Sequence, residues 1–259
     1  MVVVPNKSLG QHWLRDRNIL AEIADSAELS NTDSVLEIGP GLGTLTSELL
    51  RRAGSVTAVE FDSQLAKKLP SQFPGNSLTV VEADILSFDL DGLEPGYKVV
   101  ANVPYYITSK IVQKLMTAKN KPSLVVLLVQ KEVAQRIAAK AGDMSMLALS
   151  AQIFAEASLG VEVPRRYFTP APKVDSQVVL LRTRDQPLIA EIDQPAFFRV
   201  AKSGFVAKRK KLRSSIAAGL AISKPAAEEL LRHANIDPDK RAEDLSIAEW
   251  QRLAKDGVS

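Results

Sequence analysis

The chain of 259 residues has no cysteine and only two histidines, His12 and His233. Without cysteine it has no disulfide, no thiolate nucleophile and no Cys-ligated zinc site. Because the two histidines stand near opposite ends of the sequence, they do not have the spacing of a metal-binding motif. We therefore expect no metal site.

Long hydrophobic stretches are also missing. The longest unbroken aliphatic run, 124–129, has six residues, whereas a helix needs about 20 apolar residues to cross a bilayer. The first five residues, Met-Val-Val-Val-Pro, are too few for the apolar segment of a secretory signal, which has about 7–15 residues. We therefore expect a cytoplasmic protein with no membrane partner.

Aromatic residues make up only 5% of the chain, but 46% hydrophobic and 24% charged residues are typical of a globular protein. The net charge of +3 is unevenly placed, because 15 Lys and Arg face 11 Asp and Glu from Arg182 onward. Segment 200–213 contains no acid and six cations, namely Lys202, Lys208, Arg209, Lys210, Lys211 and Arg213. Such a run is commonly a solvated helix face. The alternative is a patch that binds nucleic-acid phosphates.

Strand and helix patterns alternate through the first two-thirds of the chain. Short runs rich in β-branched residues predict buried strands at 34–38, 55–60, 78–84, 97–102 and 124–129. Apolar residues at helical spacing predict helices at 45–53, 63–69, 109–118 and 131–139. This alternation predicts a doubly wound α/β domain with a mainly parallel sheet.

The pattern changes after Leu149. We expect a helical segment through Ala157, a proline-rich stretch at 164–172, and a strand at 176–181 that completes the sheet with antiparallel strands at its edge. Helices are then predicted at 197–205, 208–220, 225–234 and 247–254, with Ser223 and Ser246 as N-caps. The predicted domains are 1–182, which is α/β, and 183–259, which is small and all-helical.

A glycine loop follows the first predicted strand and opens a helix. Gly39-Pro-Gly41-Leu-Gly43 lets the backbone approach a ligand closely. Its G-x-G-x-G spacing departs from the dinucleotide fingerprint G-x-G-x-x-G, because Thr44 follows the last glycine. The pyrophosphate-binding interpretation is therefore weakened, and a purely structural turn is the simpler alternative.

Acidic residues end the next two strands. Glu60, at the end of the strand that follows the glycine loop, is placed to accept hydrogen bonds from both hydroxyls of a ribose. Asp84 is placed to accept a hydrogen bond from an adenine amine. Taken singly, either acid is more commonly a capping or surface residue. Together with the loop they predict a pocket for an adenosine without phosphates, which S-adenosylmethionine fits better than NAD.

The tetrapeptide Asn102-Val-Pro-Tyr105 ends the fourth predicted strand. An amine conjugated to a purine is a poor nucleophile because its lone pair is delocalised. The side-chain carbonyl of Asn102 and the backbone carbonyl of Val103 are placed to hold both N–H bonds, and Tyr105 to stack on the base. Catalysis would then rest on positioning and electrostatics. The alternative is an ordinary proline turn after a strand.

With these motifs, the chain resembles the small-subunit rRNA adenine dimethyltransferases along nearly its whole length. The resemblance is carried, in family order, by segments 7–14, 37–46, 82–86, 102–107, 168–176, 208–213 and 241–246. It implies a seven-stranded, mainly parallel methyltransferase sheet with a small helical, basic rRNA-binding domain. The implied reaction transfers methyl groups from S-adenosylmethionine to two adjacent adenosines in a hairpin near the 3′ end of small-subunit rRNA, during subunit biogenesis.

The resemblance also implies roles for individual residues. The implied cofactor-binding residues are His12 and Leu14, over the methionine end, Gly39 and Gly41, Glu60 at the ribose, Asp84 at the adenine, and Asn102. The implied catalytic residues are Asn102, which holds the target amine, Tyr105, which stacks on the flipped adenine, and Phe168, which covers its other face. Taken alone, Phe168 would be a core aromatic. The implied RNA-binding residues are Lys208, Arg209, Lys210, Lys211 and Arg213.

Two positions depart from the family pattern. Trp13 stands where the family usually has Phe, and the basic segment reads Lys-Arg-Lys-Lys where Arg-Arg-Lys is common. Lysine holds phosphate as a point charge and lacks the bidentate fork of arginine. Neither change alters a residue that the resemblance implies to be catalytic.

Three other functions are open to this pattern. The related large-subunit rRNA adenine methyltransferases of macrolide resistance share the loop and the Asn-x-Pro-Tyr motif, but segments 105–107, 172–176 and 241–246 resemble the small-subunit family. A non-catalytic RNA-binding relative would be expected to have lost Glu60, Asn102 or Tyr105. A small-molecule methyltransferase would have no use for the basic C-terminal region. We expect a monomer, because no helix has a heptad stripe.

Overall fold

The computed structural model describes residues 11–75, 77–207 and 209–256. Its internal contacts divide the chain into two compact units. The first comprises Met1–Gln135 and Ala155–Thr183, and the second Arg136–Phe154 and Arg184–Ser259. The division after Thr183 lies next to the boundary expected from the sequence. Segment 136–154 was expected in the first domain, but it groups with the helical unit.

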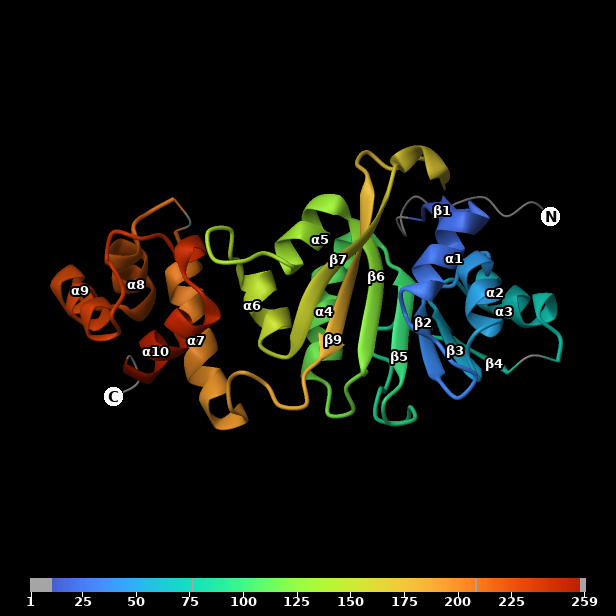
Figure 1. The fold of residues 1–259 in the computed structure, drawn as a ribbon, viewed down its shortest axis with the longest axis horizontal. Coiled ribbons are helices and arrows are strands. Elements are labelled where there is room, and N and C mark those ends of the chain that lie inside the picture. The colour runs from blue at the N-terminus through green and yellow to red at the C-terminus, as the bar shows by residue number, and fades with distance from the viewer. Residues whose placement is uncertain (1–10, 76, 208, 257–259) are drawn as a thin grey trace. The chain divides into compact units, whose positions relative to one another are not determined.

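Seven strands form the large sheet of the first unit in the spatial order β4-β3-β2-β5-β6-β9-β7 (Figure 1). They are β2 (Ser34–Ile38), β3 (Ser55–Glu60), β4 (Leu78–Glu82), β5 (Lys98–Asn102), β6 (Leu124–Gln130), β7 (Ala155–Val163) and β9 (Ser176–Thr183). The pairings among β2 to β6 are parallel, and β9 runs antiparallel to both β6 and β7. This confirms the mainly parallel, doubly wound sheet. The strand order reverses between β2 and β5, where such sheets bind ligands.

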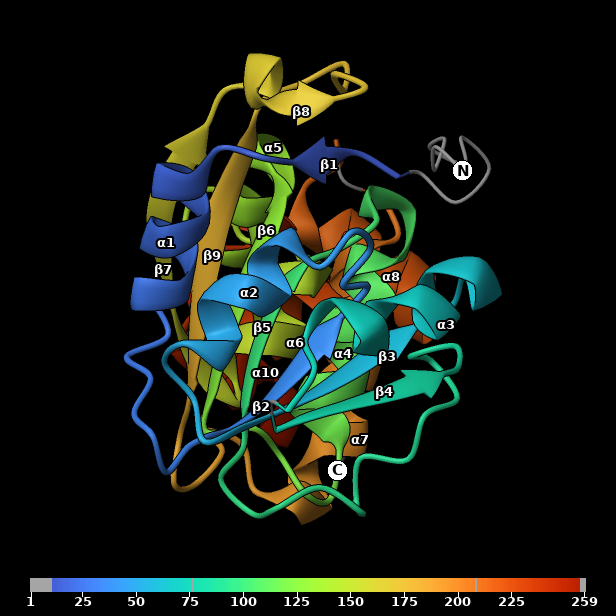
Figure 2. The same cartoon turned by 90° about the vertical axis from the view of Figure 1, so that its right-hand side faces the viewer.

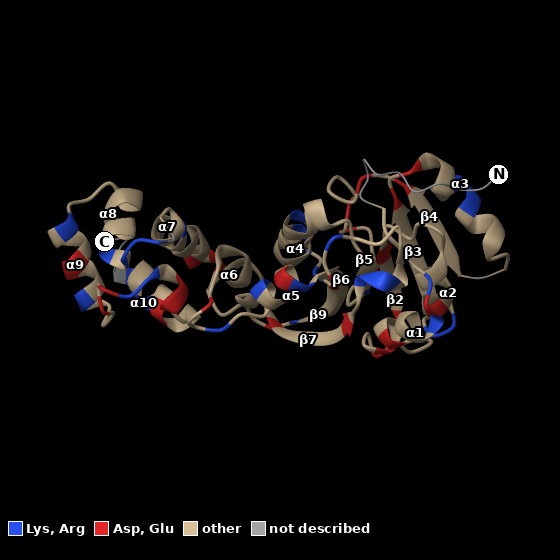
Figure 3. Cartoon of the chain, turned by 90° about the horizontal axis from the view of Figure 1, so that it is seen from above, with Lys and Arg blue, Asp and Glu red and all other residues tan. Residues whose placement is uncertain are grey.

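Helices cover both faces of this sheet. They are α1 (Arg17–Asp25), α2 (Thr44–Leu50), α3 (Ser63–Gln72), α4 (Thr108–Thr117) and the start of α5 (Lys131–Ile137). Figures 2 and 3 show α1 and α4 on opposite sides of β5 and β6. The carboxylates of Asp16 and Asp62 cap α1 and α3 by accepting backbone N–H bonds, which satisfies donors that have no partner within the helix.

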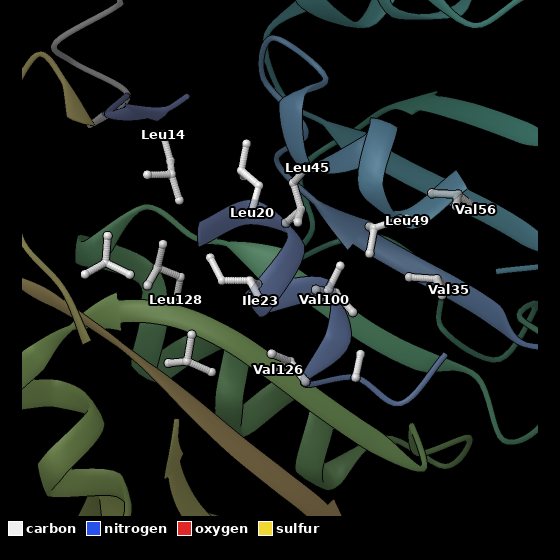
Figure 4. Close-up of a cluster of buried hydrophobic side chains, with 14 of the residues drawn as sticks. Leu14, Leu20, Ile23, Val35, Leu45, Leu49, Val56, Val100, Val126 and Leu128 are labelled. Atoms are coloured by element: carbon white, nitrogen blue, oxygen red, sulfur yellow. The ribbon is translucent and has the colours of Figure 1, made fainter. Parts of the chain in front are cut away.

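A large hydrophobic cluster lies beneath α1 and α2 (Figure 4). Leu20 and Ile23 of α1 pack there with Val35 of β2, Val100 of β5 and Val126 of β6. Five such residues at 3% exposure or less each contribute about 1.5–3 kcal/mol of transfer free energy. This packing anchors α1 on β2, β5 and β6, next to the strand ends that form the site described below.

A second, two-stranded antiparallel sheet joins β1 (Trp13–Leu14) to β8 (Phe168–Thr169). Trp13 lies opposite Thr169, and Leu14 opposite Phe168. The chain ahead of α1 is thereby fixed against a segment from a much later part of the sequence.

The expected helix through Ala157 is wrong beyond Gln152. Helix α6 (Met146–Gln152) ends there, and residues from Ala155 onward form the edge strand β7. Much of β7 is solvent-exposed, and its register with β9 shifts between Leu159 and Glu162. An edge strand with small residues, Gly160 and no sustained alternation lacks the pattern on which strand prediction depends.

The second unit is helical. Besides α6 it contains α7 (Gln194–Phe205), α8 (Leu212–Leu220), α9 (Lys224–His233) and α10 (Ile247–Asp256). Short 3₁₀ helices lie at Glu191–Asp193 and Ala242–Asp244 in this unit, and at Tyr105–Ile107 and Arg165–Tyr167 in the first unit. Ser223 and Ser246 accept N–H bonds at the starts of α9 and α10, as predicted. Trp250, 1% exposed, stacks on Phe205 at 5.6 Å between ring centroids.

The predicted helix at 208–220 begins later, at Leu212. Lys211 has extended backbone angles, and the N–H of Leu212 donates to the carbonyl of Lys240 at 2.7 Å. The described basic residues before α8 therefore lie on a turn rather than on a helix face. Among the described residues, no helix combines the length and the apolar composition needed to cross a bilayer.

Candidate functional site

A cavity of about 360 Å³ lies at the carboxyl ends of β2, β3, β4 and β5. It is lined by eight of the residues singled out from the sequence, namely His12, Leu14, Gly39, Gly41, Glu60, Asp84, Asn102 and Tyr105. Every one of them comes from a strand end, the glycine loop or the N-terminal segment. The parallel sheet therefore brings these distant residues together at one edge.

The glycine loop has a left-handed backbone conformation at all three glycines. Gly39, Gly41 and Gly43 all have positive φ, at 67°, 57° and 78°. A Cβ on Gly43 would lie 2.7 Å from Cδ1 of Leu69 in α3, so a larger residue there would have to displace that side chain and adopt a strained positive φ. At Gly39 there is nothing within 4 Å of the Cβ position, so its open side is available to a ligand.

Glu60 is buried at the end of β3, and both of its carboxylate oxygens are oriented by backbone donors. Oε2 accepts from the N–H of Gly41 at 3.0 Å, and Oε1 from the N–H of Asp62 at 2.8 Å. Burial raises the pKa of Glu60, and these hydrogen bonds partly oppose that rise. Because a carboxylate has about four acceptor sites, each oxygen keeps acceptor capacity for a hydroxyl in the cavity.

A second carboxyl group, Glu37, also lines the cavity, and sequence analysis gave it no role. It is 1% exposed and accepts from the hydroxyl of Thr46 at 2.6 Å. Burial, with a contribution from the nearby Glu60 charge, raises its pKa to about 8. A lone acid in the apolar strand Val-Leu-Glu-Ile, just before the glycine loop, is the signal that would have found it.

Asp84 follows β4 at the rim of the cavity and is exposed. Its Oδ1 accepts from the N–H of Leu86 at 2.9 Å and so closes a local turn. This turn holds the carboxylate at the rim and leaves Oδ2 for another donor. The turn-forming and ligand-binding interpretations of Asp84 are therefore compatible.

The N-terminal segment 11–14 crosses the cavity and is tied to three other elements. The His12 carbonyl accepts from Nδ2 of Asn102 at 3.3 Å, and the Leu14 carbonyl from the Thr44 hydroxyl at 3.0 Å. Nδ1 of His12 donates to the Pro170 carbonyl at 2.7 Å. Trp13 is buried against Gly41, with an indole N–H that has no hydrogen-bond partner among the described residues.

Asn102 and Tyr105 lie together at the end of β5. Because Nδ2 of Asn102 donates to His12, its Oδ1 is left as an acceptor. The Tyr105 hydroxyl hydrogen-bonds the hydroxyl of buried Ser176 at 2.7 Å, and burial raises the pKa of Tyr105. This bond fixes the plane of the tyrosine ring at the cavity wall.

Phe168 is the one predicted catalytic residue that does not line the cavity. It is 3% exposed, lies on β8, and packs in the hydrophobic cluster with Leu14. The structure thus gives it the core position that its aromatic character alone suggested. A contact of Phe168 with the target base stays a prediction.

The predicted basic segment of the helical unit is partly neutralised. Lys211 pairs with Asp239 at 2.9 Å, and Arg213 with Asp239 at 2.8 Å and with Glu228 at 3.4 Å. Arg209 and Lys210 are exposed and form no ion pair within the described part of the chain. Lys208 lies outside the described residues. Acidic and basic residues alternate along α9 and α10 (Figure 3).

Comparison with known proteins identifies the family of the chain. The sequence model of the family described as ribosomal RNA adenine dimethylase matches residues 4–256. Two relatives called ribosomal RNA small subunit methyltransferase A, from Dehalococcoides mccartyi strain CBDB1 and Lactococcus lactis, are 44% and 42% identical. The alignments cover 95% and 96% of this chain and 86% and 88% of theirs.

Two solved structures share the fold over nearly their whole length. A dimethyladenosine transferase from Plasmodium falciparum superposes with a TM-score of 0.80 at 27% identity, covering 95% of this chain and 98% of its own. The 23S rRNA methyltransferase ErmE superposes with a TM-score of 0.77 at 31% identity, covering 94% and 98%. The sheet order and the loop at its switch point define the first unit as a methyltransferase fold of the Rossmann-like class. The family model and the relatives narrow this class, and the chain belongs to the ribosomal RNA adenine dimethylase family.

Proposed function

We propose that this protein transfers methyl groups from S-adenosylmethionine to the exocyclic amines of adenosines in small-subunit rRNA. The proposed targets are two adjacent adenosines in a hairpin near the 3′ end. The observation that carries the proposal is the position of Asn102, which lines the cavity together with the glycine loop and Tyr105. Its amide oxygen accepts no hydrogen bond from the residues that the structure describes. A cytoplasmic location and a monomeric state stay predictions.

The cavity fits an adenosine-containing methyl donor. The open side of Gly39 and the buried Glu60 carboxylate offer the loop and the acceptor that an unphosphorylated nucleoside needs. His12, Leu14, Gly39, Gly41, Glu60, Asp84 and Asn102 would hold the donor. When bound, S-adenosylmethionine supplies an electrophilic methyl group, so no general base is needed before attack.

The chain's own contribution is to orient the target amine. The Asn102 amide is fixed by its bond to the His12 carbonyl, so Oδ1 faces away from His12 and can accept an N–H bond of the adenine amine. An amine held in this way becomes more pyramidal and regains nucleophilic character. Tyr105, fixed by Ser176, would support the face of the base.

The ErmE structure raises large-subunit rRNA as a second candidate substrate. At 31% identity it is less similar to this chain than the small-subunit relatives, at 44% and 42%. This difference favours small-subunit rRNA. The basic residues Arg209 and Lys210, which are not paired within the described part of the chain, are the proposed phosphate contacts of the helical unit.

The proposal is tested by incubating the protein with labelled S-adenosylmethionine and, separately, unmethylated small subunits, large-subunit rRNA and free nucleosides. Products are digested and identified by mass spectrometry. We expect dimethyladenosine from small-subunit particles only. Label in large-subunit rRNA would favour the ErmE-like function, and tight RNA binding without transfer would indicate a non-catalytic relative.

A further inference from the structure

Basic residues gather around the two-stranded sheet of the α/β unit, in segments to which sequence analysis gave no RNA-binding role. Arg15 directly follows Leu14 of β1, and Arg165 and Arg166 shortly precede Phe168 of β8. Because Leu14 pairs with Phe168 in antiparallel register, the two segments lie side by side (Figure 2). The small sheet therefore brings together cations that are 150 residues apart in the sequence.

Two of these arginines are held by aromatic rings. The guanidinium of Arg15 lies over the Trp13 ring, 6.0 Å from its centroid, and that of Arg166 lies over the Tyr167 ring at 4.9 Å. An aromatic face attracts a cation without neutralising it. Both side chains are thus oriented and keep their full charge.

The third arginine is anchored through a carbonyl. Nη1 of Arg165 donates to the carbonyl of Lys173 at 3.2 Å. The acids of these segments bond to the backbone instead, because Asp175 accepts from the N–H of Arg165 and Asp16 from two N–H groups at the start of α1. Five exposed cations of this surface form no ion pair within the described residues, namely Arg15, Arg17, Arg165, Arg166 and Lys173.

This surface differs from the basic turn of the helical unit. There, Lys211 and Arg213 pair with Asp239, and among the described residues of the turn Arg209 and Lys210 are left without an acid. Like charges that lie together repel one another, so unpaired cations around the small sheet lower stability unless an anion binds them. The arrangement is therefore better explained by an anionic ligand than by the needs of the fold.

We propose that this surface, formed by Arg15, Arg17, Arg165, Arg166 and Lys173, binds backbone phosphates of the RNA that flank the target adenosines. The inference rests on the proposed function and gives the α/β unit an RNA-binding surface of its own. The guanidinium fork donates two parallel N–H bonds to a phosphate, which lysine cannot do. The three anchored arginines supply this geometry.

The position of the surface favours RNA over other anions. Leu14, which precedes Arg15, lines the cavity, and Nδ1 of His12 donates to the carbonyl of Pro170 at 2.7 Å. The surface thus adjoins the cavity on both of its segments. A nucleotide whose base leaves the stack and enters a pocket keeps its backbone outside that pocket. The phosphates next to the target base therefore lie within reach of cations at the cavity edge.

The test measures the affinity of the hairpin RNA by filter binding at several salt concentrations. One variant removes three charges, by Arg15→Gln, Arg165→Gln and Arg166→Gln. A second keeps the charges, by Arg15→Lys, Arg165→Lys and Arg166→Lys. The matched control removes three exposed lysines of the same unit that form no ion pair within the described residues, by Lys67→Gln, Lys68→Gln and Lys119→Gln. Calorimetry with S-adenosylmethionine checks the cavity of each variant.

We expect the glutamine variant to lower the slope of log affinity against log salt by about 2 to 3, since each phosphate contact contributes about 0.7–1. The control should lower it by less than about 1. The lysine variant should keep the slope but bind more weakly, because it lacks the fork. Cofactor affinity should be unchanged in all three.

Four results would overturn the inference. They are a wild-type slope in the glutamine variant, an equal loss in the control, no hairpin binding by the wild type, and tighter binding to phosphatidylglycerol vesicles than to the hairpin. If the wild type methylates small subunits while the glutamine variant keeps the wild-type slope, the inference fails and the proposed function stands.

Discussion

The two units differ in what surrounds their charged groups. At the cavity of the α/β unit, Glu37 and Glu60 are buried and are bonded to a hydroxyl and to backbone N–H groups. In the helical unit, Lys211 and Arg213 are about half and one-third exposed and pair with acids. Exposed ion pairs contribute at most about 1 kcal/mol, whereas buried carboxyl groups without a basic partner reduce stability. The buried carboxyl groups of the first unit therefore lower its stability at the cavity. In the second unit, the number of Lys and Arg residues in the sequence exceeds the number of cations that are free to bind phosphate, because Lys211 and Arg213 already pair with acids.

The largest effect should come from Asn102, the residue proposed to orient the amine. Asn102→Ala removes the only side-chain acceptor proposed for the target amine and should lower turnover about 100- to 1000-fold, as the loss of a positioned catalytic hydrogen bond does elsewhere. Cofactor affinity should change only a few-fold. Single-turnover assays on small subunits, with calorimetry on the same samples, check both. Turnover within tenfold of the wild type would exclude the amine-orienting role.

Removing the Glu60 charge should have the next largest effect. Glu60→Gln weakens charge-assisted hydrogen bonds worth about 1.5–3 kcal/mol each, so affinity for S-adenosylmethionine should fall about 10- to 100-fold. Glu82→Gln is the matched control, because Glu82 lies opposite Glu60 in the β3–β4 register but is exposed and does not line the cavity. Equal calorimetric affinity in both variants would remove the ribose-binding role.

Much of the site could be predicted from the sequence, because Gly39, Glu60 and Asn102 lie at the ends of buried strands and parallel strands end at one edge. The Glu37–Thr46 bond could not, since it depends on how α2 packs on β2. Nor could the pairing of Lys211 with Asp239, which joins two separate segments of the helical unit. Phe168 was expected at the cavity because segment 168–176 resembles a motif of the adenine dimethyltransferase family. Its burial beside Leu14 follows from β1–β8 pairing, which two-residue strands do not reveal in sequence.

The glycine loop tests whether the geometry of the site costs stability. Gly43→Ala places a Cβ at φ 78° and 2.7 Å from Leu69, and should lower the free energy of unfolding by about 1–3 kcal/mol. Gly92→Ala, with ordinary φ and nothing within 4 Å, is the control. Denaturant titrations compare the two. Equal stabilities would show that the loop adapts without strain.

Glu37 should make stability depend on pH. Its folded pKa of about 8 exceeds the ordinary 4.5, so between these values the folded state holds a proton that the unfolded state has released. The contribution of this proton to the free energy of unfolding is fully present below pH 4.5 and is lost as the pH rises to 8. The free energy of unfolding falls in this range by at most about 1.4 kcal/mol per pH unit. Glu37→Gln should flatten the change between pH 6 and 7. Identical slopes for both proteins would place the Glu37 pKa near its ordinary value.

The smallest effect concerns the cations of the helical unit. Arg209→Glu with Lys210→Glu should lower the slope of log affinity against log salt by about 1 to 2, since each phosphate contact contributes about 1. Lys211→Glu with Arg213→Glu should change this slope less, because those cations already pair with acids. Filter binding of the hairpin at several salt concentrations measures both. A larger change from the paired set would reverse the comparison between free and neutralised cations.

The proposed methyl transfer is best tested by mapping the product at nucleotide resolution after the purified protein has acted on unmethylated small subunits. We expect two dimethylated adenosines, adjacent in the hairpin near the 3′ end of the rRNA, and neither of them with Asn102→Ala. Methylation elsewhere in the small subunit, on large-subunit rRNA only, or equally by Asn102→Ala would contradict it.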